Sequence, residues 1–290
     1  QNRLYFVSTK RQQIDGIWRD YQSLTSVSGM GNILWSVPLG EGGGYDMSGP
    51  VLSNDETTVY IYRQDRNYNG AIIEAINTET GLLNWSRPLE WGGTGWQTFT
   101  SFTVDGNGTI WLASYVKDDP NNCYGRGDYL IGISPSGAIS HQLPFKGDID
   151  CGSHIRVGPS GTIYLTYDDA RPYYYDGTRW IYWNSYWQSW YYYDYGYILV
   201  AGDPPPAGGL AAYDPVDGLK WKFELPDSFE ANASPAIDAA ENIYFAASFG
   251  ERLYSINKDG QLNWMYDIAP GVEPGGSNWN VDHDQFTYGV

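Results

Sequence analysis

The chain has 290 residues, of which 34 are acidic and 17 basic, so its formal net charge is −17. This charge excludes a nucleic-acid-binding surface, which needs a basic face to displace counterions from phosphate. Hydrophobic residues make up 42% of the chain and aromatic residues 17%, with 26 Tyr, 13 Trp and 35 Gly. This composition favours strands and tight turns and excludes disorder, and the lack of any apolar run of about 18 residues excludes a membrane span.

The first predicted element is a strand near the N-terminus, because Arg3 to Ser8 has the composition of one. The repeats that follow already supply every strand of the fold predicted below, so residues 1–20 form a surplus segment. Its strand can pair with an edge of its own molecule, or it can add to the sheet of a neighbouring copy. We expect the second arrangement, with Leu4, Tyr5, Phe6 and Val7 as the exchanged residues.

Two hairpin units then alternate along the chain, and each occurs five times. The first unit is a short strand, a polar turn and an alternating strand, found at 48–62, 100–114, 153–167, 233–247 and 277–290. The second unit is found at 24–39, 72–89, 130–145, 210–226 and 253–268. Period-2 alternation, as in Val59-Tyr60-Ile61-Tyr62, and Gly-containing turns predict antiparallel hairpins rather than helices.

One unit of each kind makes a four-stranded blade, and successive first units begin 44 to 80 residues apart. Repeats of this size predict an all-β fold, a β-propeller of five four-stranded blades over residues 21–290. The chain opens with a second unit and ends with a first unit. Strands from both termini are therefore predicted to close the ring and remove its open sheet edges.

The turns of the second unit carry a resemblance to a known family. Asn77 to Gly81 followed by Leu83-Asn84-Trp85, and Lys258 to Gly260 followed by Leu262-Asn263-Trp264, resemble the quinoprotein-type (PQQ-like) propeller repeat. The resemblance covers residues 24–290 apart from one insertion. The Trp of this repeat is present at four positions, whereas Ser140 stands in the third blade, which predicts looser packing there; the four are Trp35, Trp85, Trp221 and Trp264.

The resemblance implies a fold more than a function, since the family includes quinone-dependent dehydrogenases, assembly scaffolds and binding proteins. Its quinone-dependent members use larger rings, calcium, an Asp base and often a disulfide between adjacent cysteines. Here the two cysteines lie 28 positions apart and five blades are predicted, so we expect no quinone cofactor. Neither a Gly-x-Ser-x-Gly elbow nor a His-Glu-x-x-His motif is present, so the sequence does not predict an enzyme.

Propeller topology predicts that one face carries the long connections. The loop from Lys117 to Asp128, the insertion at 168–208 and the connection holding Cys151 all emerge on that face. A disulfide between Cys123 and Cys151 is therefore predicted, with two buried free thiols as the alternative.

The insertion is the most unusual stretch, because 14 of the 25 residues from Tyr173 to Tyr197 are Tyr or Trp. A patch of this kind marks an interface, either with another subunit or with sugar rings, unless it folds down as a lid on its own chain. The candidate interface or ligand-stacking residues are Tyr173, Tyr174, Tyr175, Trp180, Tyr182, Trp183, Tyr186, Trp187, Trp190, Tyr191, Tyr192 and Tyr193.

Acidic residues on the same predicted face could ligate calcium, since that ion prefers several carboxylate oxygens. No calcium-loop motif is present, and the default interpretation is that these are solvated turn residues. We therefore predict no cofactor, with calcium as the alternative ligand of Asp118, Asp119, Asp148, Asp150 and Asp168.

Three acceptor sequons, and a first residue that is Gln rather than Met, predict a secreted or cell-surface chain whose leader has been removed. The predicted glycosylation sites are Asn84, Asn107 and Asn232.

Together these features predict a non-catalytic extracellular propeller that acts as a structural or adhesive subunit of a filament-like polymer. Its main partner would be a second copy of itself. The alternative is a carbohydrate-binding module that uses the aromatic insertion, and the third hypothesis is a PQQ-like or glycan-active enzyme.

Overall fold

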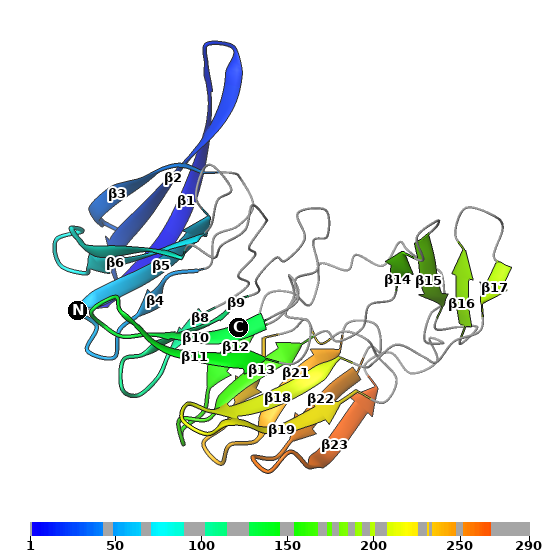
Figure 1. The fold of residues 1–290 in the computed structure, drawn as a ribbon. Coiled ribbons are helices and arrows are strands. Elements are labelled where there is room, and N and C mark those ends of the chain that lie inside the picture. Colours follow the sequence, from blue (N-terminus) through cyan, green and yellow to red (C-terminus); the bar gives the residue numbers. More distant parts are fainter. Residues whose placement is uncertain are drawn as a thin grey trace. The chain divides into compact units, whose positions relative to one another are not determined.

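The computed structural model describes residues 2–42, 49–64, 71–89, 102–114, 128–145, 154–167, 173–175, 180–184, 189–192, 198–200, 208–225, 231, 234–247 and 252–267. Within these ranges every regular element is a β-strand, and the strands form six antiparallel sheets (Figure 1). The predicted all-β fold class is confirmed. No helix in this part of the chain is long and apolar enough to cross a membrane. The chain falls into two compact units, Gln1–Lys146 and Gly147–Val290.

The first compact unit holds three sheets. The first sheet has the order β1 (Arg3–Ile14), β2 (Ile17–Ser28) and β3 (Ile33–Gly42). The second sheet is β4 (Val51–Leu52), β5 (Thr58–Gln64), β6 (Ala71–Asn77) and β7 (Leu83–Leu89). The third sheet is β8 (Phe102–Val104), β9 (Ile110–Ser114), β10 (Asp128–Ile133) and β11 (Ile139–Phe145).

The second compact unit holds the other three sheets. The fourth sheet is β12 (Ile155–Val157), β13 (Ile163–Tyr167), β18 (Gly209–Asp214) and β19 (Gly218–Glu224). Between β13 and β18 the chain forms a separate inserted sheet of β14 (Tyr173–Tyr175), β15 (Trp180–Asn184), β16 (Ser189–Tyr192) and β17 (Ile198–Val200). The fifth sheet is β20 (Ala236–Ile237), β21 (Ile243–Ala247), β22 (Arg252–Ile256) and β23 (Leu262–Asp267).

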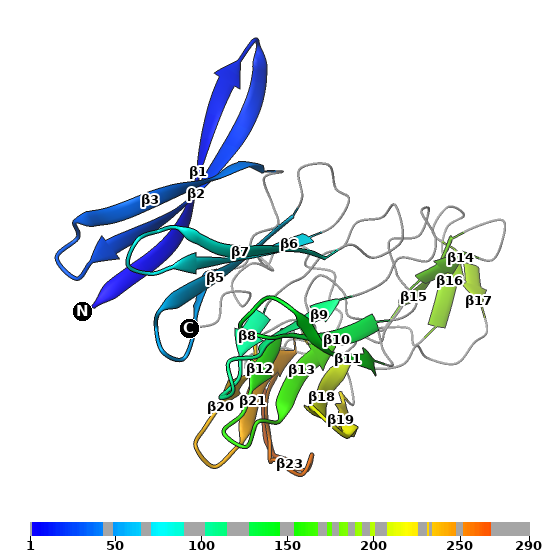
Figure 2. The ribbon, with the colours of Figure 1, turned by 60° about the vertical axis from the view of Figure 1, so that its left-hand side comes forward.

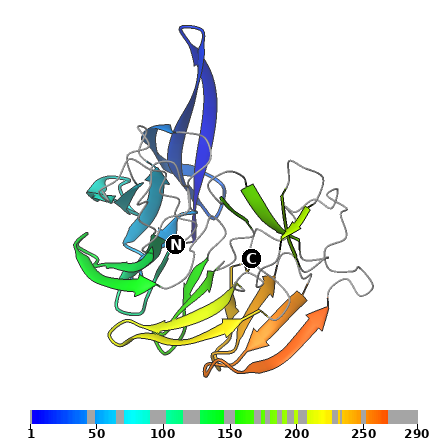
Figure 3. The ribbon, with the colours of Figure 1, turned by 45° about the vertical axis from the view of Figure 1, so that its right-hand side comes forward.

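Neighbouring sheets within each unit pack face to face through apolar side chains. Val59 and Ile61 of β5 pack against Leu24 and Leu39 of the first sheet. The alternate residues of the same strand belong to a second cluster with the third sheet. A third cluster joins the fourth sheet, green to yellow in Figure 3, to the fifth sheet, which is orange. Because both faces of β5 are buried, its apolar residues run without interruption, as a strand between two packed sheets requires.

The five repeat sheets share a cross-strand row of one aromatic residue, one small residue and one outer aromatic residue. In the second sheet Tyr60, Ala75 and Trp85 are directly opposite one another across β5, β6 and β7. The ring centroids of the two aromatic residues lie 6.0 Å apart over the small one. The corresponding rows are Tyr5-Ser26-Trp35, Trp111-Gly132-His141, Tyr164-Ala212-Trp221 and Tyr244-Ser255-Trp264.

Three of the outer Trp residues tie their sheet to the next one in the chain. The indole N–H of Trp85 donates to the carbonyl of Pro135 over 2.8 Å. Its ring covers Gly137, where a Cβ would lie 2.9 Å from the Trp85 Cδ2 atom and where φ is +85°. Both the space and the backbone conformation therefore require Gly at this turn. Trp35 and Trp221 make the same two contacts, with the turns that hold Gly81 and Gly260.

The third sheet differs from the prediction at the outer position. The register pairs Gly132 with His141 and Ile133 with Ile139, so Ser140 lies in a bulge outside the ladder. His141, and not Ser140, therefore stands where the other sheets have Trp. Its ring lies 5.1 Å from that of Trp111, and the two meet because Gly132 between them has no side chain.

The N-terminal strand is longer than predicted and belongs to the first sheet. β1 pairs with β2 over all twelve of its residues, including Leu4, Tyr5, Phe6 and Val7. The two strands meet at Asp15 and Gly16, whose φ angles of 52° and 78° fit a type I′ hairpin turn. The hairpin continues past the last β2–β3 partners, Asp20 and Gly42, as a two-stranded arm (Figures 1 and 2). The predicted domain boundary at residue 20 thus falls inside β2, while exchange between copies and ring closure stay predictions.

Candidate functional site

The inserted sheet holds most of the predicted aromatic site. β14 contains Tyr173, Tyr174 and Tyr175, β15 contains Trp180, Tyr182 and Trp183, and β16 contains Trp190, Tyr191 and Tyr192. Tyr186, Trp187 and Tyr193 lie outside the described residues. The insertion therefore forms a sheet of its own, in which the strand register gives each of these residues its position.

The register of this sheet divides its residues between two faces. Tyr173, Tyr182, Tyr191 and Leu199 are opposite one another in a row across all four strands. Since successive residues of a strand alternate between faces, Tyr175, Trp180, Asn184 and Ser189 share the face of this row. The other face has Tyr174, Ile181, Trp183, Trp190, Tyr192, Ile198 and Val200. One face thus has five aromatic positions, two polar positions and Leu199, whereas the other has four aromatic positions and three aliphatic ones.

The other predicted site residues fall in two groups. Cys123, Cys151, Asp118, Asp119, Asp148, Asp150, Asp168 and Asn232 all lie outside the described residues, so the disulfide and the calcium site stay predictions. The described part of the chain contains no group of three or more His, Cys, Asp or Glu residues that could hold a metal ion. Asn84 and Asn107 are exposed, as glycosylation requires.

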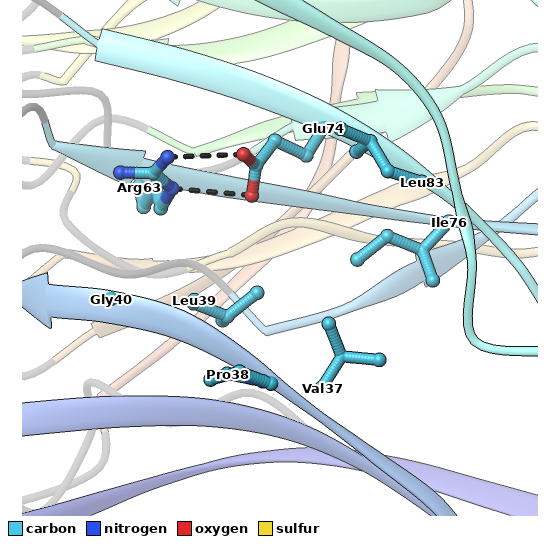
Figure 4. Close-up of a pocket in the computed structure, with 8 residues that line it drawn as sticks. All are labelled: Val37, Pro38, Leu39, Gly40, Arg63, Glu74, Ile76 and Leu83. Carbon is cyan, nitrogen blue, oxygen red and sulfur yellow. Dashed lines mark hydrogen bonds and ion pairs between the residues drawn. The ribbon is translucent and has the colours of Figure 1, made fainter.

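A second candidate site is a cavity between β3 of the first sheet and β5, β6 and β7 of the second (Figure 4). Its volume is about 360 Å³. Most of its lining is apolar, and among the described lining residues the charged ones are Arg63 and Glu74, which form an ion pair; the others are Val37, Pro38, Leu39, Gly40, Ile76 and Leu83.

The ion pair in this cavity is bidentate and mostly buried. The guanidinium Nε of Arg63 donates to Oε2 of Glu74 over 3.2 Å, and Nη2 donates to Oε1 over 3.0 Å. Glu74 is only 9% exposed. The sequence alone does not reveal this site, because the pairing of β5 with β6 that brings the two residues together depends on register. The available signal was a pair of charges at positions that are uncharged in the other repeats.

Comparison with known proteins shows the fold of this chain but does not assign it to a family. Neither the protein-family models nor the curated proteins include a match to this chain. Among solved structures, puromycin hydrolase matches with a TM-score of 0.55 at 15% identity, over 94% of this chain and 37% of its own. Virginiamycin B lyase from Staphylococcus aureus matches with a TM-score of 0.52 at 11% identity, over 93% and 76%. The Dos1 propeller matches with a TM-score of 0.52 at 8% identity, over 89% and 57%.

These similarities confirm the β-propeller fold and correct the predicted function. The sequence analysis expected a non-catalytic structural or adhesive subunit of a filament. That expectation is wrong: the similar structures include a lyase and a hydrolase, and none of the three is named as a filament or adhesion protein. The expectation rested on aromatic density, which serves a ligand-stacking surface as well as a subunit interface, and on a surplus strand that in fact pairs with β2.

Proposed function

We propose that this chain is a secreted, glycan-binding β-propeller in which the inserted sheet contacts the sugar. The observation that carries the proposal is the register of that sheet, which gathers Tyr173, Tyr175, Trp180, Tyr182 and Tyr191 on one face. Aromatic rings stack on the apolar C–H faces of sugars, while phenol, amide and hydroxyl groups bond to sugar hydroxyls. Asn184 and Ser189 supply two such polar groups on the same face.

The spacing of the row fits an extended ligand. Neighbouring strands lie about 4.8 Å apart, so Tyr173, Tyr182 and Tyr191 form a ladder with steps of that size. A ladder of equivalent contacts suits a ligand that repeats one chemical unit, such as a polysaccharide chain. The opposite face has Ile181, Ile198 and Val200 beside four aromatic positions, and in this proposal it packs against protein.

Charge indicates which glycans fit. The four strands of the inserted sheet contain no Asp, Glu, Lys or Arg. The whole chain carries −17, which repels polyanions at low ionic strength. The proposal is therefore for an uncharged polysaccharide. The finer assignment of the propeller to the quinoprotein-type family is proposed from the turns that hold Gly81 and Gly260 and from their Trp contacts.

The test compares two adjacent tyrosines on opposite faces. Tyr191→Ala removes the central rung of the ladder, and Tyr192→Ala makes the same chemical change on the other face. Soluble cello-, xylo-, manno- and laminari-oligosaccharides are titrated into each variant and followed by Trp fluorescence and calorimetry. Tyr191→Ala should weaken binding by at least about tenfold, since a buried stacking aromatic contributes on the order of 1 to 3 kcal/mol. Tyr192→Ala should leave the affinity unchanged.

Two results would contradict the proposal: absence of binding to every uncharged oligosaccharide, or equal losses for the two variants. Release of new reducing ends during the titration would show that the bound glycan is also cleaved. Mass spectrometry of the secreted protein before and after glycosidase treatment tests secretion and the sequons at Asn84 and Asn107.

A further inference from the structure

The ion pair between Arg63 and Glu74 occupies positions that are uncharged in the four other repeat sheets. Glu74 directly precedes the small residue of the cross-strand row, and its counterparts are Thr25, Ile131, Ala211 and Tyr254. All four counterparts are buried. Arg63 lies three residues after the row aromatic on the preceding strand, where the other sheets have Ser8, Ser114, Tyr167 and Ala247.

Packing does not account for this exception. Removing two ions from water costs free energy, and apolar residues of similar size commonly replace such a pair without loss of stability. The other sheets show that the fold accepts neutral residues at both positions. In the second sheet a cavity adjoins the pair, so one explanation can account for both the cavity and the charges.

The arrangement of groups in the cavity defines a ligand class. Figure 4 shows Arg63 and Glu74 pointing toward each other at one side of the cavity, with Leu39, Ile76 and Val37 beyond them. The two bonds to Glu74 use two of the five guanidinium N–H groups, and each carboxylate oxygen keeps lone-pair capacity. The pair therefore offers both donors and acceptors at one place while its net charge is zero.

We propose that this cavity binds a small uncharged ligand with an apolar body and an amide or hydroxyl head group. The head group accepts from Arg63 and donates to Glu74, and the body contacts Val37, Leu39, Ile76 and Leu83. The volume of about 360 Å³ lies in the lower part of the usual range for small-molecule sites, roughly 300 to 1,000 Å³. The proposal is independent of glycan binding by the inserted sheet.

The experiment uses four probes that share one ring: cyclohexanecarboxamide, cyclohexylmethanol, cyclohexanecarboxylate and cyclohexylmethylammonium. Binding to the full chain is measured by saturation-transfer NMR and calorimetry. The amide and the alcohol should bind at least about tenfold more tightly than the two ions, because each ion leaves one partner of the pair unmatched.

The decisive variant replaces both charges, as Arg63→Met with Glu74→Met, because removing only one would leave an unpaired buried ion and endanger folding. It should lose the preference for the amide and the alcohol. The matched control, Arg252→Met with Asp267→Met, removes a cross-strand ion pair of the fifth sheet and should keep it. Tyr191→Ala should also keep it, which separates this site from the glycan surface.

The proposal is overturned if no probe binds the unmodified chain, if the carboxylate or the ammonium binds as tightly as the amide, or if the double Met variant keeps the preference.

Discussion

The second and third sheets contain the same cross-strand row but end it differently. In the second sheet, Trp85 reaches the next sheet, donating to Pro135 and covering Gly137. In the third sheet the bulky residue is on the inner side, where the indole of Trp111 donates to a carboxylate of its own sheet. The outer residue, His141, contacts that Trp and the neighbouring Ser140.

The comparison separates two roles that the repeat usually combines. The aromatic row fills the space within a sheet in both cases, whether Trp is the outer residue, as Trp85 is, or the inner residue, as Trp111 is. In three of the five sheets an outer Trp also links the sheet to its successor, through an indole hydrogen bond and a covered Gly.

The largest expected effect comes from removing the link of the second sheet. Trp85→Ala should lower the free energy of unfolding by about 3 kcal/mol, because it removes a large ring and its hydrogen bond together. Urea unfolding measures the change. Trp264→Ala is the control: Trp264 is 42% exposed, and its indole has no acceptor among the described residues. Trp264→Ala should lower the free energy of unfolding by less than half as much as Trp85→Ala. Equal losses in the two variants would show that the indole link of Trp85 does not contribute to stability.

A smaller effect is expected from filling the centre of the third row. A Cβ on Gly132 would lie 2.9 Å from the His141 Nδ1 atom and 3.1 Å from the Trp111 Cη2 atom. Gly132→Ala should therefore destabilise the chain by about 1 to 2 kcal/mol through overpacking. The matched change in the second sheet, Ala75→Gly, should cost about 0.5 to 1 kcal/mol through backbone entropy. A stabilising effect of Gly132→Ala would show that the close approach of the two aromatic rings does not depend on the absence of a side chain at Gly132.

The smallest effect concerns the turn that precedes the second row. Hydrogen bonds from the Ser53 hydroxyl and then from Thr57 lower the pKa of Asp55 below its ordinary value of 3.8. A depressed pKa in the folded state contributes stability that is present above pH 3.8 and lost as the pH falls through the folded value. Asp55→Asn should therefore flatten the decline of the urea midpoint below pH 3.8. An unchanged decline would contradict this assignment.

The sequence predicted those features that repeat at fixed spacing. Alternation in Val59 to Tyr62 and Gly-containing turns are local signals, and they were sufficient for the hairpins and the propeller fold. The outer residue of the third row was assigned wrongly, because matching residue types drew attention to Ser140. Hydrogen-bond register, which places Ser140 in a bulge, decides the position in favour of His141.

Two other features, the Arg63–Glu74 ion pair and the N-terminal hairpin, could not be predicted from the spacing of the repeats. The pairing of Arg63 with Glu74 depends on the register of β5 and β6, which the spacing of the repeats does not determine. The long N-terminal hairpin did have a local signal, since Asp15-Gly16 between two Ile residues is a typical type I′ turn sequence. Extending the first strand to this turn would have assigned residues 3–28 to a hairpin of the first sheet.

The position of the inserted sheet has a consequence for protein engineering. β13 and β18 pair in unbroken register from Ile163 and Tyr213 to Tyr167 and Gly209, although a separate four-stranded sheet is inserted between them. Lengthening a loop adds only about 0.6 kcal/mol of closure entropy per doubling of its length. This connection is thus a natural point for grafting foreign modules, such as another binding domain or a fluorescent reporter, with its two attachment strands already held side by side.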